Sequence, residues 1–235
     1  VEKFLGPPKP VELEVGDRGF PRRAELLTSL LPLAELLPLL AGLDLAMSVL
    51  LTEGLPDHHP FSLNLAVSLA VIEGIESALP RMATRGLEVK WPNDIMMKGR
   101  KAGGILIENS WRGSSWASAV IGVGLNVFGT APYPNATRLL TTNEDANALS
   151  QLQSAILKRL NNRLSELNSP KALLRQYHER LLGWGQRQRW QFDGQEIRGV
   201  LEGVDLDGRL CVLGKDGMQC HAPGEVGWLG MEPEA

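Results

Sequence analysis

The sequence predicts an α/β (α+β) chain in which a mixed sheet flanked by helices is followed by a small C-terminal β-barrel of the SH3-like type. In residues 1–186, apolar residues recur at helical spacing in long segments and alternate in short ones, which predicts helices interspersed with strands. After residue 186 the runs are short and are separated by Asp-Gly dipeptides, which are typical of hairpin turns. We therefore expect one domain at residues 1–186 and the barrel at residues 187–235.

The elements of the first domain follow from local patterns. A short strand is expected at residues 11–15, within an irregular arm, and another at residues 43–51, before a turn. Helical spacing after Pro60 predicts a helix to about Leu79, with Ser62 as its N-cap. The remaining expected elements are strands at 87–90, 95–97, 104–108 and 117–126, and helices at 148–167 and 170–182. In the barrel, strands are expected at 188–192, 196–204, 210–213 and 219–222.

Composition limits the classes of function. The chain of 235 residues is 43% hydrophobic and 22% charged, as is usual for a globular protein. Its net charge of −3 offers no basic surface for nucleic acid, so we expect no nucleic-acid partner. The leucine-rich run at residues 26–45 contains Glu35 and Asp44, and Pro32 and Pro38 would break a spanning helix. We therefore expect no membrane segment there.

The two cysteines, Cys211 and Cys220, are too few for a disulfide framework and lack the spacing of a metal site. A reducing compartment is the simpler interpretation, and we expect the cytoplasm.

A cluster of chemically active residues begins at Lys90. The run Lys-Trp-Pro-Asn-Asp places a cation, an amide and a carboxylate within residues 90–94, and a second cation, Lys101, precedes Gly103-Gly104. Glycines let a ligand approach the backbone, a lysine suits a phosphate, and Asp94 has oxygen ligands for Mg²⁺. A hairpin with solvated lysines is the alternative interpretation of the same residues.

Three longer strings closely resemble the catalytic core of biotin–protein ligases of the class without a DNA-binding domain. They are Lys-Trp-Pro-Asn-Asp-Ile at 90–95, Gly-Arg-Lys-Ala-Gly-Gly-Ile-Leu-Ile-Glu at 99–108, and Ile-Gly-Val-Gly-Leu-Asn-Val at 121–127. The resemblance implies a class II synthetase-like catalytic domain that uses ATP, Mg²⁺ and biotin. It also implies ligation through biotinyl-5′-AMP to a lysine of a biotin carboxyl carrier protein.

The resemblance further implies roles for single residues. Lys101 corresponds to the family's central lysine, which reaches the biotin carboxyl and the α-phosphate, and Lys90 and Asp94 to its adenylation site. The residues implied near the nucleotide or its metal are Asn93, Asp94 and Asn126, and those implied beside biotin are Gly104, Ile105, Gly122 and Gly124. Trp91 is expected to be a core aromatic residue.

The sequence departs from the family ahead of Gly42. The family's Gly-Arg-rich biotin loop is not recognisable there, and the apolar residues 26–41 stand in its place. We therefore expect weaker biotin binding than in an intact ligase. Two alternatives stay open: a degenerate, non-catalytic member that binds a ligand or partner only, and a related lipoate or octanoyl ligase. The sequence also leaves open whether the chain forms a homodimer.

Overall fold

The computed structural model describes residues 43–56, 59–129, 134–140 and 147–231, together with the backbone of residues 11–13 and 24–27. These residues form a seven-stranded sheet with the order β1-β2-β3-β7-β6-β5-β4 and a five-stranded sheet with the order β11-β10-β9-β8-β12. The expectation of a mixed sheet was wrong, because every pair of neighbouring strands in both sheets is antiparallel. The neighbours β4–β5, β5–β6 and β6–β7 are joined by connections of two or three residues, which favour antiparallel pairing.

The strands of the first sheet are mostly those that the alternation predicts. β6 and β7 are longer than expected, because pairing continues past Glu108 to the turn at Gly113, where φ is 61°. The strands are β1 (Val11–Leu13), β2 (Ala24–Leu27), β3 (Leu45–Leu51), β4 (Leu87–Lys90), β5 (Asp94–Met97), β6 (Arg100–Arg112) and β7 (Ser115–Leu125). β2 falls within a stretch for which no strand was expected. Of residues 26–41, which stand in the place of the family's biotin loop, residues 28–41 lie outside the described residues.

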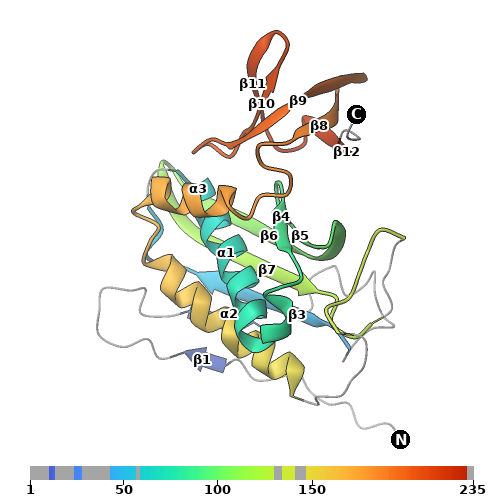
Figure 1. The fold of residues 1–235 in the computed structure, drawn as a ribbon. Coiled ribbons are helices and arrows are strands. Elements are labelled where there is room, and N and C mark those ends of the chain that lie inside the picture. Colours follow the sequence, from blue (N-terminus) through green and yellow to red (C-terminus); the bar gives the residue numbers. More distant parts are fainter. Residues whose placement is uncertain are drawn as a thin grey trace, which may run out of the picture.

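Three α-helices in the described part of the chain, α1 (Phe61–Ala78), α2 (Ala148–Leu164) and α3 (Pro170–His178), lie on the same side of this sheet (Figure 1). A 3₁₀ turn, η2 (Pro80–Met82), follows α1. α1 is long and apolar enough to cross a membrane, but most of it is buried inside the protein. The prediction that Ser62 caps α1 was wrong, because Pro60 is the N-cap and the buried Ser62 hydroxyl has no partner among the described residues.

The two faces of the first sheet differ. Along β7, Ala119, Ile121 and Val123 are buried, whereas Gly122 and Gly124, between and after them, are not. The buried residues belong to the core that the helices cover. The alternate residues therefore face the opposite side, which we call the open face.

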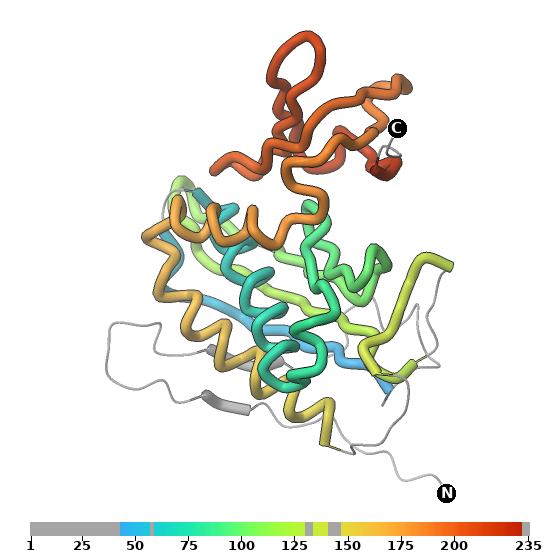
Figure 2. The backbone as a smooth tube through the Cα atoms, viewed as in Figure 1, coloured from blue at the N-terminus to red at the C-terminus, as the bar shows by residue number. Residues whose placement is uncertain are grey.

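The second sheet consists of β8 (Arg187–Phe192), β9 (Gln195–Val204), β10 (Leu210–Gly214), β11 (Gly217–His221) and β12 (Val226–Met231). The pairing between described strands runs from β11 to β12 without joining these two edges, so closure into a barrel is not seen. β12 was not expected from the sequence. We call the seven-stranded sheet with its helices the first body and the five-stranded sheet the second body. The chain passes from the first body to the second once, after α3 (Figure 2).

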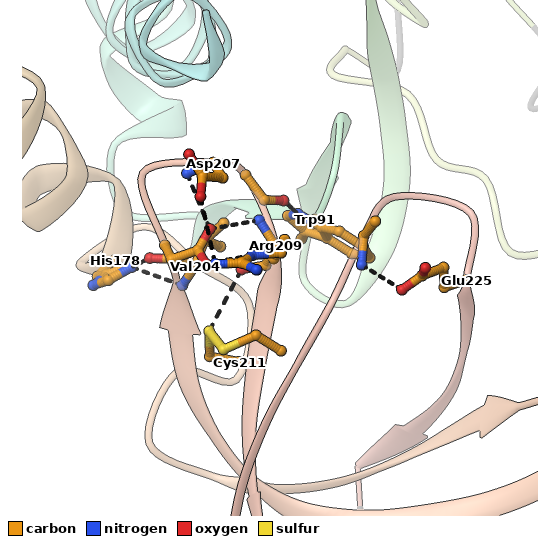
Figure 3. Close-up of a disulfide and its surroundings, with 11 residues drawn as sticks. Trp91, His178, Val204, Asp207, Arg209, Cys211 and Glu225 are labelled. Carbon is orange, nitrogen blue, oxygen red and sulfur yellow. Dashed lines mark hydrogen bonds and ion pairs between the residues drawn. A yellow bond between two sulfur atoms is a disulfide. The ribbon is translucent and has the colours of Figure 1, made fainter. Parts of the chain in front are cut away.

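Cys211 and Cys220 form a disulfide, contrary to the expectation of free thiols. The two residues are directly opposite each other in the β10–β11 register. The sequence did not indicate the pairing, because only this register brings the two side chains together. The disulfide lies beside the loop that carries Asp207 and Arg209, which faces Trp91 (Figure 3).

The two sheets meet at a junction where their cores are continuous. Leu181 from the first body and Trp190 and Leu201 from the second belong to one buried cluster. Trp91 is 9% exposed, as expected of a core aromatic, and its Nε1 donates a hydrogen bond of 3.0 Å to the Gly208 carbonyl oxygen. The Lys90–Asp94 segment is therefore in direct contact with the second sheet.

Candidate functional site

Lys101 is fixed by its backbone at the start of β6. Its N–H donates to the Asn135 carbonyl at 2.9 Å, and its carbonyl accepts from Thr137 N–H at 2.7 Å. Residues 135–137, which are distant in the sequence, therefore hydrogen-bond to both backbone groups of Lys101. The Lys101 side chain is 44% exposed, so its ammonium group is available to a ligand.

Asp94 lies between the two predicted lysines. Its Oδ1 is 2.5 Å from Lys101 Nζ, and its Oδ2 is 3.3 Å from Lys90 Nζ. The β5–β6 pairing and the turn between Lys90 and Asp94 bring these three side chains together, as the sequence predicted for one site. Two cations and one carboxylate leave a local excess of positive charge, which suits an anionic ligand.

Three glycines form a strip on the open face beside Lys101. Gly104 is directly opposite Gly124 in the β6–β7 register, and Leu106 is opposite Gly122. A Cβ added to Gly124 would meet no described atom within 4 Å, and one added to Gly104 or Gly122 would make only ordinary contacts of 3.7 Å or more. None of the three has a positive φ. Neither packing among the described residues nor backbone conformation explains these glycines, whereas a ligand lying on the strip would.

Lys101 stands over this strip. A Cβ on Gly104 would lie 3.7 Å from both Cε and Nζ of Lys101, which places the ammonium above the same face. The neighbouring Gly103 has a different role. A Cβ there would collide with the Gly124 carbonyl oxygen and lie 2.6 Å from Leu125 Cδ2, so Gly103 permits the close approach of β6 and β7.

Asn93 and Ile105 are joined to each other across the start of β6. Ile105 is 3% exposed and its side chain belongs to the core, so only its backbone is directed to the open face. Asn93 holds Ile105 on both backbone groups: its carbonyl accepts from Ile105 N–H at 2.9 Å, and its Nδ2 donates to the Ile105 carbonyl at 2.9 Å. Asn93 thus stabilises the start of the β5–β6 pairing, next to Asp94.

Asn126 has a comparable structural task at the end of β7. Its Nδ2 donates to the Thr137 carbonyl at 3.1 Å, and its carbonyl accepts from Leu139 N–H at 2.9 Å. These bonds hold the segment that pairs with Lys101. Asn126 is therefore near the site and supports it through the backbone.

The arrangement does not form a magnesium site by itself. Both Asp94 oxygens already face ammonium groups. In the described ranges, the one group of three residues with suitable ligand atoms is Asp205, Cys211 and Cys220, where the sulfurs are bonded to each other and the carboxylate pairs with Arg209. A magnesium ion would therefore have to bring phosphate ligands with it, as it commonly does.

The junction contributes residues that the sequence analysis missed. Trp228 in β12 lies with its ring centroid 5.3 Å from Lys90 Nζ, and Gln188 accepts a 2.8 Å hydrogen bond from the Trp228 indole. Val226 and Trp228 do alternate as strand residues should, but Gly227 and Gly230 obscure the signal.

A histidine also lies at this junction. Burial lowers the pKa of His178, and a backbone hydrogen bond with Val204 opposes this effect. Nε2 of His178 lies 2.9 Å from the Val204 N–H, which donates to the neutral ring, and 3.0 Å from the Val204 carbonyl oxygen, to which a protonated Nε2 would donate.

Comparison with known proteins agrees with this geometry. The model of the biotin/lipoate A/B protein ligase family matches residues 39–126, which include Lys90, Asp94 and Lys101. The biotin--[acetyl-CoA-carboxylase] ligase of Mycobacterium tuberculosis is 36% identical over 157 residues, which cover 64% of this chain and 56% of that protein. The chain is thus similar to biotin protein ligases in both comparisons.

A second curated protein is similar over more of this chain. The bifunctional ligase/repressor BirA of Bacillus spizizenii is 27% identical over 76% of this chain and 56% of its own length. The chain thus spans about half the length of these curated relatives.

Solved structures support the fold. The biotin protein ligase of Aquifex aeolicus superposes with a TM-score of 0.62 at 22% identity, covering 79% of this chain and 81% of that one. The same Aquifex protein in complex with biotin and ATP gives a TM-score of 0.60 at 21% identity, covering 77% of each chain.

Proposed function

We propose that this chain activates biotin with ATP to form biotinyl-5′-AMP and transfers the biotinyl group to a lysine of a biotin carboxyl carrier protein. The observation that carries the proposal is the position of Lys101, whose ammonium stands over the strip of Gly104, Gly122 and Gly124 while it pairs with Asp94. Biotin and ATP are the two ligands of the Aquifex complex, which has the same fold.

The charges suit the first step. A biotin carboxylate oxygen attacks the α-phosphorus of ATP, the bond to the β-phosphate oxygen breaks, and pyrophosphate leaves. Both reactants are anions, so a cation between them lowers their repulsion and stabilises the charge that develops on the phosphorus oxygens. Lys101 takes this role, and Asp94 and Lys90 keep its ammonium in place until the phosphates arrive. Mg²⁺ enters with ATP and neutralises phosphate charge.

The glycine strip suits the other ligand. Without side chains at Gly104, Gly122 and Gly124, a flat and largely apolar ring system can lie against the sheet beneath the Lys101 ammonium. In the second step the acceptor lysine's amine attacks the acyl carbon, AMP leaves, and the amine loses a proton. We propose the acetyl-CoA carboxylase carrier domain as acceptor, after the name of the Mycobacterium relative. The cytoplasm remains our proposal for the location, but the Cys211–Cys220 disulfide removes the argument from free thiols on which it was expected.

The test is a biotin-dependent pyrophosphate assay with Mg-ATP, followed by transfer of labelled biotin to a carrier domain. Pyrophosphate release that requires biotin, and labelling of the carrier lysine, would support the proposal. Equal release with lipoate in place of biotin would instead identify a lipoate ligase. Binding of biotin and ATP by calorimetry without pyrophosphate release would identify a non-catalytic member and overturn the proposed activity.

A further inference from the structure

The junction between the two sheets contains a cavity of about 200 Å³ beside the proposed adenylation site. Lys90, Trp91 and Trp228 line it together with Gln188. The polar groups here are engaged with one another. The junction therefore links the second sheet to Lys90 through a series of direct contacts.

The first step is the contact between Lys90 and Trp228. The Lys90 ammonium lies 5.3 Å from the centroid of the Trp228 ring, within the range of a cation–π interaction. On its other side the same ammonium is 3.3 Å from Asp94 Oδ2. The cation is therefore held between a carboxylate of the first sheet and an aromatic ring of the second. A free lysine side chain would otherwise sample several rotamers.

The second step fixes the ring itself. Trp228 Nε1 donates a 2.8 Å hydrogen bond to Gln188 Oε1. Gln188 is 2% exposed, and its Nε2 donates to the carbonyls of Leu182 at 3.2 Å and Gly183 at 2.8 Å. A flipped amide would place its oxygen against two carbonyl oxygens, so the carboxamide has one orientation. The Trp228 ring is thus tied to the segment that joins α3 to β8.

We propose that Trp228 is a positioning residue for Lys90: the indole ring holds the lysine ammonium against Asp94, and Asp94 in turn holds Lys101 over the glycine strip. This inference rests on the proposed function and adds the residue through which the second sheet acts on the site. Without Trp228, Lys90 is free to leave Asp94, and the Lys101–Asp94 pair loses one of its two constraints.

A measurement on Lys90 itself tests the contact independently of catalysis. In the full chain with ¹³Cε-labelled lysine, the Lys90 methylene protons should show an upfield ring-current shift, assigned by its loss in Lys90→Arg. The shift should disappear in Trp228→Leu and persist in part in Trp228→Phe, which keeps a ring but loses the indole N–H. A Lys90 signal at the position of solvated lysines in the parent protein would overturn the proposal.

Kinetics test the consequence. Trp228→Leu should lower kcat/KM for biotin-dependent pyrophosphate release on the order of tenfold, the scale of one partly desolvated cation–π contact, and Trp228→Phe should recover part of the loss. The matched control is Trp184→Leu. Trp184 is another junction indole, which donates to the Glu202 carbonyl and lies tilted against the His178 ring, with centroids 5.6 Å apart. The control should keep both the parent rate and the Lys90 shift.

An equal loss of rate in Trp228→Leu and Trp184→Leu would mean that any weakening of the junction lowers the rate. That result would overturn the specific role of Trp228. Parent-like kinetics in Trp228→Leu would overturn it as well. If the parent chain releases no pyrophosphate, the proposed function fails, while the Lys90 shift still decides whether the contact exists.

Discussion

The two faces of the seven-stranded sheet use alternate residues of the same strands, yet only one of them is filled. On the covered face, Ile121 and Val123 of β7 pack into the core with the helices. On the open face, Gly122 and Gly124 carry no side chain. A Cβ on Gly122 would lie 3.7 Å or more from other described atoms, and one on Gly124 would meet none within 4 Å. The covered face therefore supplies stability, whereas the open face has the space that our proposed ligand requires. Substitutions on the covered face should therefore lower the free energy of unfolding, whereas those on the open face should lower ligand binding or adenylation.

The largest expected effect is on the open face, at the cation above it. Lys101→Ala should lower biotin adenylation by roughly 10²–10³-fold, the loss typical of one group that stabilises transition-state charge. The side chain is partly exposed and fills no core space, so the free energy of unfolding should change by less than about 1 kcal/mol. Pyrophosphate release and urea unfolding measure the two quantities. Adenylation at the parent rate would remove Lys101 from the mechanism.

The sharpest contrast uses adjacent glycines. Gly103→Ala forces a methyl group against the Gly124 backbone and should lower the free energy of unfolding by about 1–3 kcal/mol. Gly104→Ala meets nothing closer than 3.7 Å and should stay within about 0.5 kcal/mol of the parent. Urea denaturation of both variants tests the comparison, and equal midpoints would contradict it.

A bulky residue on the strip should separate binding from stability. Gly124→Val adds a side chain where no described atom lies within 4 Å, so the folded state should be almost unaffected. The same side chain would occupy the space that we assign to biotin, and its affinity should fall roughly tenfold or more. Isothermal titration with biotin checks this. Unchanged affinity with unchanged stability would show that biotin does not lie over Gly124.

The smallest effect is expected at the junction, as a dependence of stability on pH. Because burial lowers the pKa of His178 in the folded state, the unfolded chain takes up a proton first as the pH falls. The neutral His178 ring therefore makes its full contribution to stability at pH values above the ordinary histidine pKa of about 6.5. This contribution is lost progressively as the pH falls below that value. His178→Gln should show a flatter dependence of Tm on pH between about 8 and 5. Parallel curves for parent and variant would exclude His178 as the source.

The sequence was informative about the first domain because local patterns and chemistry coincide there. Alternation predicted β4 and β5, and the residue types around Lys101 predicted which side chains would share a site. The same reasoning could not separate Gly103 from Gly104, because their roles depend on which strand lies opposite. Nor could it place Ile105, whose direction is set by the β6 register.

The second sheet was harder to predict. Glycines at 227 and 230 interrupt the alternation of β12, so neither the strand nor Trp228 was expected to reach Lys90. The disulfide was missed for a related reason, because a separation of 9 residues becomes a cross-strand pair only in the observed β10–β11 register. Long-range pairing, which local sequence does not encode, decides both features.

The concentration of indoles at the junction gives the protein a built-in optical reporter. Of the six tryptophans, Trp91, Trp190 and Trp228 line the cavity there, and Trp184 bonds to β9 beside it. Two of these four are almost completely shielded from water. The emission spectrum of the unlabelled chain should therefore be dominated by the contact between the two sheets. A red shift that precedes the loss of helical circular dichroism would mark separation of the second sheet before the first one unfolds.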